Sequence, residues 1–161
     1  MKRVELTRGQ FALMDNGDFS KIKDNKWLAS WAVNTNSFYA ERRASKKEIS
    51  EGCPSHLSMH RVVMNAKKGD IIDHINHNTL DNRKCNLRFV TCSQNNMNKK
   101  AYSNNNSGIP GVNWRPVSKK WRAYIQSEGK QVHLGSFTSK DDAIKARKAG
   151  EIKYFGEYRL K

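Results

Sequence analysis

The stretch that decides the fold reads Ile71-Ile72-Asp73-His74-Ile75, then Asn86-Leu87-Arg88-Phe89-Val90, then Thr91-Cys92-Ser93-Gln94-Asn95. The two apolar runs have the length of strands, and the polar stretch 76–84 between them predicts a loop. Thr91 followed by Gln94 forms a capping box, which predicts that a helix begins there. The stretch therefore predicts a strand–loop–strand–helix unit, whose helix carries Asn95 and Asn98 on one face.

This unit groups three side chains that can serve phosphodiester hydrolysis. A carboxylate (Asp73), an imidazole (His74) and an amide oxygen (Asn95) can surround one divalent cation. Hydrolysis needs a nucleophilic water, a general base near neutral pH and a Lewis acid, and histidine suits the second role. Because neighbouring residues of a strand point to opposite faces, the Asp73-His74 pair needs a strand end or a bulge to reach one phosphate.

The net charge of +15 on 161 residues, from 30 Lys+Arg and 15 Asp+Glu, indicates a polyanionic partner. Residues 1–101 hold 18 basic and 10 acidic residues, and residues 102–161 hold 12 and 5, so we expect both halves to touch that partner. No apolar run could span a bilayer and no signal segment is present, so we expect a cytoplasmic protein without a membrane partner. The three cysteines are expected to be reduced thiols, with a zinc site built from Cys85, Cys92 and a histidine as the minor alternative.

The rest of the chain predicts an α+β fold. Short strands are expected at Phe11–Met14, Trp27–Leu28 and Phe38–Ala40, an exposed loop at 45–55, and a strand running into a short helix over 57–64. A polar, low-complexity linker follows the central unit. Beyond it we expect strands at 111–115, 121–126 and 131–137, then a helix capped by Thr138 or Ser139 whose stripe is Ala143, Ala146, Gly150 and Tyr154.

The central motifs resemble the HNH (ββα-metal) endonucleases, particularly the phage-type homing endonucleases. The matching residues, which cover about residues 10–100, are His60-Arg61, Asp73-His74-Ile75, Asp81-Asn82-Arg83, Asn86-Leu87-Arg88, Gln94-Asn95 and Asn98. The resemblance implies that His74 is the general base, that Asp73 and Asn95 are metal ligands, and that Asn86 braces the loop and orients His74.

The same resemblance favours one Mg²⁺ or Mn²⁺ ion per active site. Many family members have histidine where Asn95 stands, and an amide oxygen is a harder ligand than imidazole. Arg83 and Arg88 either contact phosphate or are simply solvated. His60 is expected to pack or hydrogen-bond, and His77 to be a polar or phosphate-facing side chain.

Residues 108–158 resemble the APETALA2-type DNA-binding domain, in which a three-stranded sheet lies in the major groove and a helix packs behind it. The matching text is Gly111-Val112, Trp121-Arg122-Ala123-Tyr124-Ile125, Leu134-Gly135-Ser136-Phe137 and Asp142-Ala143-Ile144-Lys145-Ala146. Strand alternation turns Val112, Trp121, Ala123, Ile125, Val132 and Leu134 toward the helix. It turns outward the expected DNA-binding residues Asn113, Arg115, Arg122, Tyr124, Gln126, Gln131 and His133. The family usually has arginine, glutamate, arginine and tryptophan where Asn113, Tyr124, Gln126 and His133 stand, so fewer charges lie on this face.

Together these features predict a metal-dependent DNA endonuclease that acts on double-stranded DNA as a monomer or as a DNA-bound dimer. We expect an HNH module at 1–100 with its ββα core at about 70–98, a linker at 101–108, and an APETALA2-type domain at 109–161. The alternatives are a sequence-specific DNA-binding regulator that keeps the nuclease fold without cutting, and an RNA-binding protein. Metal-dependent nicking separates the first alternative from a nuclease, and competition between duplex DNA and RNA separates the second.

Overall fold

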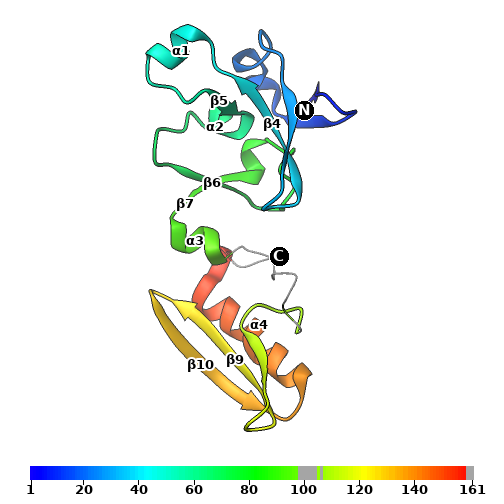
Figure 1. Ribbon diagram of the computed structural model, residues 1–161, viewed down its shortest axis with the longest axis vertical. Helices are drawn as coiled ribbons and strands as arrows, with labels where there is room; N and C mark the ends of the chain where they lie inside the picture. The colour runs from blue at the N-terminus through cyan, green and yellow to red at the C-terminus, as the bar shows by residue number, and fades with distance from the viewer. Residues whose placement is uncertain (98–104, 106, 159–161) are drawn as a thin grey trace. The chain divides into compact units, whose positions relative to one another are not determined.

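The computed structural model describes residues 1–97, 105 and 107–158. The chain divides into two compact units, Met1–Val90 and Thr91–Lys161 (Figure 1). Small antiparallel sheets and short helices alternate along it, and one three-stranded sheet packs against a helix, so the α+β prediction is confirmed. In the described part of the chain, no helix is long and apolar enough to cross a membrane.

Three small sheets form the first unit. Strand β1 (Lys2–Glu5) pairs with β2 (Phe11–Met14), and β6 (Ile71–His74) pairs with β7 (Leu87–Val90). The third sheet has the order β3 (Leu28–Ala32), β4 (Ser37–Arg43), β5 (His56–Ser58). The expected strand-to-helix run over 57–64 is β5 followed directly by α2 (Met59–Val63). Two 3-10 turns, η1 (Asn16–Lys21) and η2 (Lys84–Asn86), complete the unit.

The core of the first unit gathers side chains from elements that are far apart in sequence. The fully buried residues include Met14 of β2, Ile22 after η1, and Met59 and Val63 of α2. Trp27 packs with them and donates from Nε1 to the carbonyl oxygen of Ile22 at 3.1 Å. The N-terminal segment therefore shares one hydrophobic core with α2, the helix that precedes the β6–β7 hairpin.

Strand β2 also contacts the loop that joins β6 to β7. The backbone N–H of Leu13 donates to Leu80 O at 2.8 Å, and Asn82 N–H donates back to Leu13 O at 2.8 Å. Nearby, Asp15 accepts from the backbone N–H of Lys84 at 2.9 Å, and the ammonium of Lys84 lies 2.9 Å from Asp18. Residues 13–18 thus hold the middle and the C-terminal part of the loop.

The exposed loop predicted over 45–55 is wrong in part, because helix α1 (Lys46–Ser50) occupies its first half. Ser45 caps this helix and Glu48 completes a capping box. Glu48 also pairs with the buried Arg42 of β4, and this contact fixes the helix to the sheet. A five-residue helix without an apolar stripe is held by its cap and one ion pair, which periodicity does not reveal. Strand β1 was likewise not anticipated.

The second unit contains the predicted three strands and helix. Its sheet has the order β10 (Lys130–Phe137), β9 (Lys120–Ser127), β8 (Val112–Arg115), and α4 (Lys140–Phe155) packs on one face (Figure 1). Ser139 caps α4 by accepting from Asp141 N–H at 3.2 Å. The short α3 (Cys92–Met97) begins at the Thr91–Gln94 capping box, and η3 (Gly156–Tyr158) follows α4. Asn98 and linker residues 101–104 and 106 lie outside the described residues.

The inner face of this sheet follows the predicted alternation up to one irregularity. Val112, Ala123 and Ile125 are buried against α4. A register shift between His133 and Gly135 leaves Leu134 as the extra residue of a bulge on β10. Leu134 lies against Gly150, where an added Cβ would come within 2.6 Å of it, so the glycine allows α4 to approach β10 closely.

Candidate active site

The β6–β7 hairpin holds an ion pair between the expected metal ligand Asp73 and Arg88. The antiparallel register places these two residues directly opposite each other. Arg88 donates from Nε and Nη2 to the same oxygen, Oδ2 of Asp73, at 3.0 and 2.8 Å. Their side chains are 14% and 10% exposed, respectively. Arg88 is therefore neither solvated nor free for phosphate in this structure, because it neutralises a largely buried carboxylate.

His74 is the last residue of β6, where the sequence requires a strand end for both Asp73 and His74 to reach one phosphate. Its ring is buried among two aromatic rings from other segments. The ring centroid of His60 on α2 lies 5.1 Å away, and that of Tyr39 on β4 lies 6.2 Å away, both in edge-to-face orientation. Tyr39 and His60 also meet each other, with centroids 6.0 Å apart. These edge contacts restrict the orientation of the His74 ring.

The surroundings of His74 keep its imidazole neutral. Burial lowers the pKa of His74 below its usual range, while Asn82 and the carboxylates of Asp73 and Asp81 act in the opposite direction. The buried Nε2 atom of His74 has no hydrogen-bond partner among the residues that the structure describes. A neutral imidazole with its proton on Nδ1 can accept a proton at Nε2. Geometry and protonation state therefore both suit a general base.

Asn86 braces the turn of the loop rather than facing solvent. Its Oδ1 accepts from the backbone N–H of Asn76 at 3.0 Å, and its Nδ2 donates to the carbonyl oxygen of Asp81 at 2.8 Å. It also holds the end of β6, because its carbonyl oxygen accepts from the N–H of Ile75 at 2.9 Å. Asn86 thus holds the backbone of Ile75, the residue that follows His74, in place.

Arg83 pairs with the nearly inaccessible Asp81 in the same loop. Its Nε and Nη2 donate to Asp81 Oδ1 and Oδ2 at 2.7 and 2.6 Å, and Asn76 adds a further donor to Oδ2. The hydrogen bonds from Arg83 hold the pKa of Asp81 below its usual range. In this structure Arg83 supports the loop internally. His77 adopts a positive φ of 61° at the tip of the turn, where its backbone N–H donates to His74 O.

The predicted ligand Asn95 lies on α3, in the second unit. Its backbone N–H bonds to Thr91 O at 2.9 Å, which is the first turn of the helix, and its side chain is half-buried. The structure brings four of the predicted site residues together in one hairpin: Asp73, His74, Asn86 and Arg88. A metal site that also includes Asn95 is a proposal.

The metal donor that the hairpin offers beside His74 is the carboxylate of Asp73. Within the described ranges no group of three or more His, Cys, Asp and Glu side chains is arranged to hold a metal, and Cys85 and Cys92 are exposed thiols. Mg²⁺ and Mn²⁺ accept one or two protein oxygens and fill the remaining positions with water and phosphate. Asp73 supplies one such carboxylate oxygen in the hairpin. The buried Nε2 of His74, next in the chain to Asp73, is a nitrogen without a hydrogen-bond partner among the described residues.

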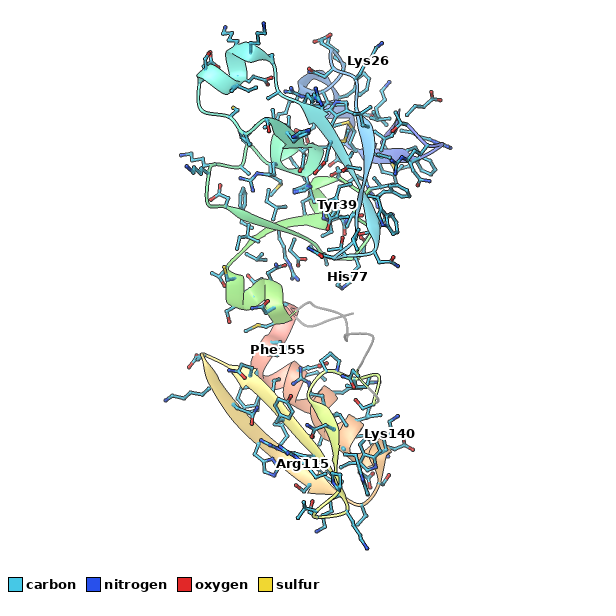
Figure 2. The ribbon with its side chains drawn as sticks, viewed as in Figure 1. Lys26, Tyr39, His77, Arg115, Lys140 and Phe155 are labelled. Atoms are coloured by element: carbon cyan, nitrogen blue, oxygen red, sulfur yellow. The ribbon has the colours of Figure 1, made fainter. Side chains whose placement is uncertain are left out.

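The residues predicted to contact DNA lie on the outer face of the second unit's sheet, away from α4. Asn113, Arg115, Gln126, Gln131 and His133 are exposed, while Arg122 and Tyr124 are half-buried. Arg115 ends β8 (Figure 2). Arg122 reaches across to Gln131 Oε1 on β10 at 2.5 Å and lies over the ring of Tyr124. This face is polar and open to solvent.

The sequence analysis did not predict that His60 and Tyr39 surround the His74 ring. His60 was expected to pack, and it does, but its partner is the His74 ring itself. Burial first, and then His74, lower the pKa of His60 to about 3. Tyr39 carries no motif signal at all. The sequence offered one hint of the contact between the His60 and His74 rings. His60 belongs to the same series of motifs and lies thirteen to fourteen residues before Asp73-His74, and α2 and β6 are successive elements of the chain.

Comparison with known proteins places these residues in a nuclease module. A family model described as HNH endonuclease matches residues 58–97, which include α2, β6, β7 and α3. Protein 3.8 of Escherichia phage T7 is 38% identical over 95 residues, covering 58% of this chain and 78% of that protein. An uncharacterised HNH endonuclease of Acanthamoeba polyphaga mimivirus is 24% identical over 149 residues, covering 88% of this chain and 73% of that protein.

No solved structure matches the chain. The identity to the phage protein and the share of it that is covered are enough to establish kinship, and the family match places an HNH endonuclease domain at residues 58–97. The chain therefore belongs to the family of phage T7 Protein 3.8, and its residues 58–97 form an HNH endonuclease domain.

Proposed function

We propose that this protein is a metal-dependent DNA endonuclease in which His74 activates water, and Asp73 and Asn95 hold one Mg²⁺ or Mn²⁺ ion. The observation that carries the proposal is the buried, neutral His74, whose Nε2 has no hydrogen-bond partner among the described residues and whose neighbour in the chain is a carboxylate. A bound divalent cation would stabilise the negative charge on the departing 3′ oxygen. The HNH domain implies a nucleic-acid substrate, and the net charge of +15 agrees with that.

In this proposal His74 and the residues around it have different roles. His74 Nε2 takes a proton from the attacking water, and the edges of Tyr39 and His60 hold its ring in one orientation. Asn86 fixes the backbone after His74, so the imidazole does not shift when DNA binds. His74 transfers the proton, whereas Tyr39, His60 and Asn86 position its ring. Substitutions can therefore test the two roles separately.

The second unit, in this proposal, is an APETALA2-type DNA reader. Its outer face offers Arg115, Arg122 and Gln131 to phosphates and base edges, while α4 supports the opposite face. Attachment in one chain raises the local concentration of the nuclease near a bound site. We extend the proposal to a homing-type role in a phage or another mobile element, acting in the host cytoplasm. One active site per chain makes a nick, and a double-strand break requires a second copy.

Nicking of supercoiled plasmid under Mg²⁺ or Mn²⁺ tests this function. His74→Ala should lower the rate by about 100-fold or more, because a general base contributes about that much. Asp73→Ala should abolish the metal dependence. His56→Ala is the matched control, since His56 is an exposed histidine of the same unit whose ring nitrogen lies 3.3 Å from Ser55 Oγ.

Duplex binding should be nearly unchanged in His74→Ala and His56→Ala. A His74→Ala protein that nicks at the wild-type rate would contradict the mechanism. Wild-type protein that binds duplex equally with and without metal, and leaves the plasmid intact, would instead support a DNA-binding regulator with a nuclease fold.

A further inference from the structure

The carboxylate proposed as a metal ligand is already bound to a cation of its own chain. Two nitrogen atoms of Arg88, Nε and Nη2, donate to the same oxygen, Asp73 Oδ2. The two residues face each other across the β6–β7 ladder, so the backbone holds them in contact. A divalent cation that binds Asp73 therefore meets a guanidinium already in place.

Two positive charges on one largely buried carboxylate repel each other. The attraction or repulsion of charges is several times stronger in such surroundings than in water. Removing a buried carboxylate's partner without replacement also destabilises a protein markedly. Arg88 and a metal ion thus compete for Asp73, and the cation that loses this contact needs another partner.

The Arg83–Asp81 pair shows why Arg88 is the one suited to exchange. Asp81 uses both oxygens toward Arg83, accepts from Asn76 as well, and is only 1% exposed, so a cation has no access to it. Arg88 instead donates to Oδ2 of Asp73, whose side chain is 10% exposed and which lies next in the chain to the proposed base. Its backbone is fixed in β7, so only its side chain needs to move.

We propose that Arg88 is an internal counter-ion that the metal displaces from Asp73, and that a DNA phosphate then receives the guanidinium, so that metal and DNA bind cooperatively. The inference rests on the proposed function, because it takes Asp73 as a metal ligand. Guanidinium pairs well with phosphate in a two-pronged geometry, which gives Arg88 a new partner once DNA is present. By linkage, DNA strengthens metal binding by the same factor by which metal strengthens DNA binding.

Calorimetric titration with Mn²⁺ tests this in the full chain carrying His74→Ala, so that bound DNA stays intact. Without DNA, adding Arg88→Gln should tighten Mn²⁺ binding about tenfold, within the range of about 5- to 150-fold that is typical of coupled sites. Arg43→Gln, which removes the same charge from an exposed position of the same unit, should change it by less than about twofold, as expected for a screened surface charge. Asp73→Asn should abolish this binding. A short duplex should strengthen Mn²⁺ binding in the parent more than in the Arg88→Gln protein.

A second measurement needs no change at Arg88, in case Arg88→Gln fails to fold. The Arg88 Nε–H signal in a nitrogen-15 NMR spectrum should shift and exchange faster with water when diamagnetic Mg²⁺ is added. The same addition should leave the signal unmoved in the Asp73→Asn protein.

The inference is overturned if Arg88→Gln binds Mn²⁺ no tighter than Arg43→Gln, or if Mg²⁺ binds with the Arg88 signal unchanged, while Asp73→Asn still abolishes binding. Equal Mn²⁺ binding by the parent and by Asp73→Asn is a different failure. It removes Asp73 as a ligand, and with it the metal site of the proposed function.

Discussion

The β6–β7 hairpin and the outer face of the β8–β9–β10 sheet use polar residues in opposite ways. In the hairpin, Asp73, Asp81 and Asn86 are buried, and each is hydrogen-bonded to a group of its own chain. On the sheet, Asn113, Arg115 and most of their neighbours project into solvent. The first arrangement fixes positions for chemistry, whereas the second keeps donors and acceptors available to a partner.

This difference leads to a simple expectation. Changes in the hairpin should cost folding stability as well as activity, because buried polar groups lose their partners. Changes on the outer sheet face should cost DNA affinity with little effect on stability, since their side chains contact mainly water. The next three experiments test that contrast.

Replacing Asn86 with leucine should have the largest effect on stability. The change leaves the N–H of Asn76 and the carbonyl of Asp81 without their partners, which are now 3.0 and 2.8 Å away. Two such losses should cost about 2–4 kcal/mol of unfolding free energy, and displacement of the loop should lower nicking at least about tenfold. Urea unfolding and plasmid nicking measure the two effects.

Asn34→Leu, at an exposed position of the first unit, is the matched control and should change the unfolding free energy by less than about 0.5 kcal/mol. If the two leucine variants were equally stable, the hairpin would not depend on its buried hydrogen bonds, and the contrast between the two regions would fail.

His60→Phe should remove part of the protein's sensitivity to acid. The pKa of His60 is about 3 in the folded protein against 6.5 for the ordinary side chain, so at pH 5 it is protonated in the unfolded chain but not in the folded one. Its contribution to stability is complete above pH 6.5 and is lost as the pH falls from 6.5 toward 3. Between pH 7 and pH 5 this amounts to about 2 kcal/mol, which unfolding at both pH values measures.

Phenylalanine keeps a flat ring against His74 without a titrating group. The variant should therefore lose less stability than the wild type between the two pH values. Equal losses would mean that other groups govern the acid response.

Arg115→Ala, at an exposed position that ends β8, should have the smallest effect on folding and a moderate one on DNA binding. Loss of one phosphate contact should weaken duplex affinity about three- to tenfold and reduce the salt dependence by about one ion. The control is Lys148→Ala, which removes the same charge from an exposed position on α4. Fluorescence anisotropy at several salt concentrations compares them. Identical salt slopes for both variants would remove the outer sheet face from the DNA interface.

Local signals in the sequence predicted the elements that depend on local interactions. The Thr91–Gln94 capping box marked the start of α3, and alternation of apolar residues marked β9 and β10. The structure has an equivalent capping box at Ser45 and Glu48, whereas the polar composition of 45–55, with Gly52 and Pro54, predicted a loop. A short helix that is stabilised by a cap and one ion pair depends on a tertiary contact, here between Glu48 and Arg42. Its sequence alone therefore does not predict it.

The surroundings of the candidate site depended on long-range contacts and were harder to predict. The register of the hairpin, in which Ile71 pairs with Val90, places Asp73 opposite Arg88. The sequence analysis did not predict this ion pair, because it considered only phosphate contact or solvation for Arg88. The rings of Tyr39 and His60 come from segments separated by more than ten residues, whose approach only the folded core fixes. Arg147 is similar, because this buried arginine reaches from α4 to the carbonyl of Tyr124.

The backbone bonds from Leu13 to the loop at Leu80 and Asn82 restrict how short a fragment containing the nuclease segment can be. A fragment starting at Ser58 would contain the whole HNH match, yet would leave behind the strand that completes its loop. An HNH fragment made to fold by itself should therefore include the β1–β2 hairpin. It would have to extend from residue 1 to residue 97, because the HNH match continues past Val90 into α3.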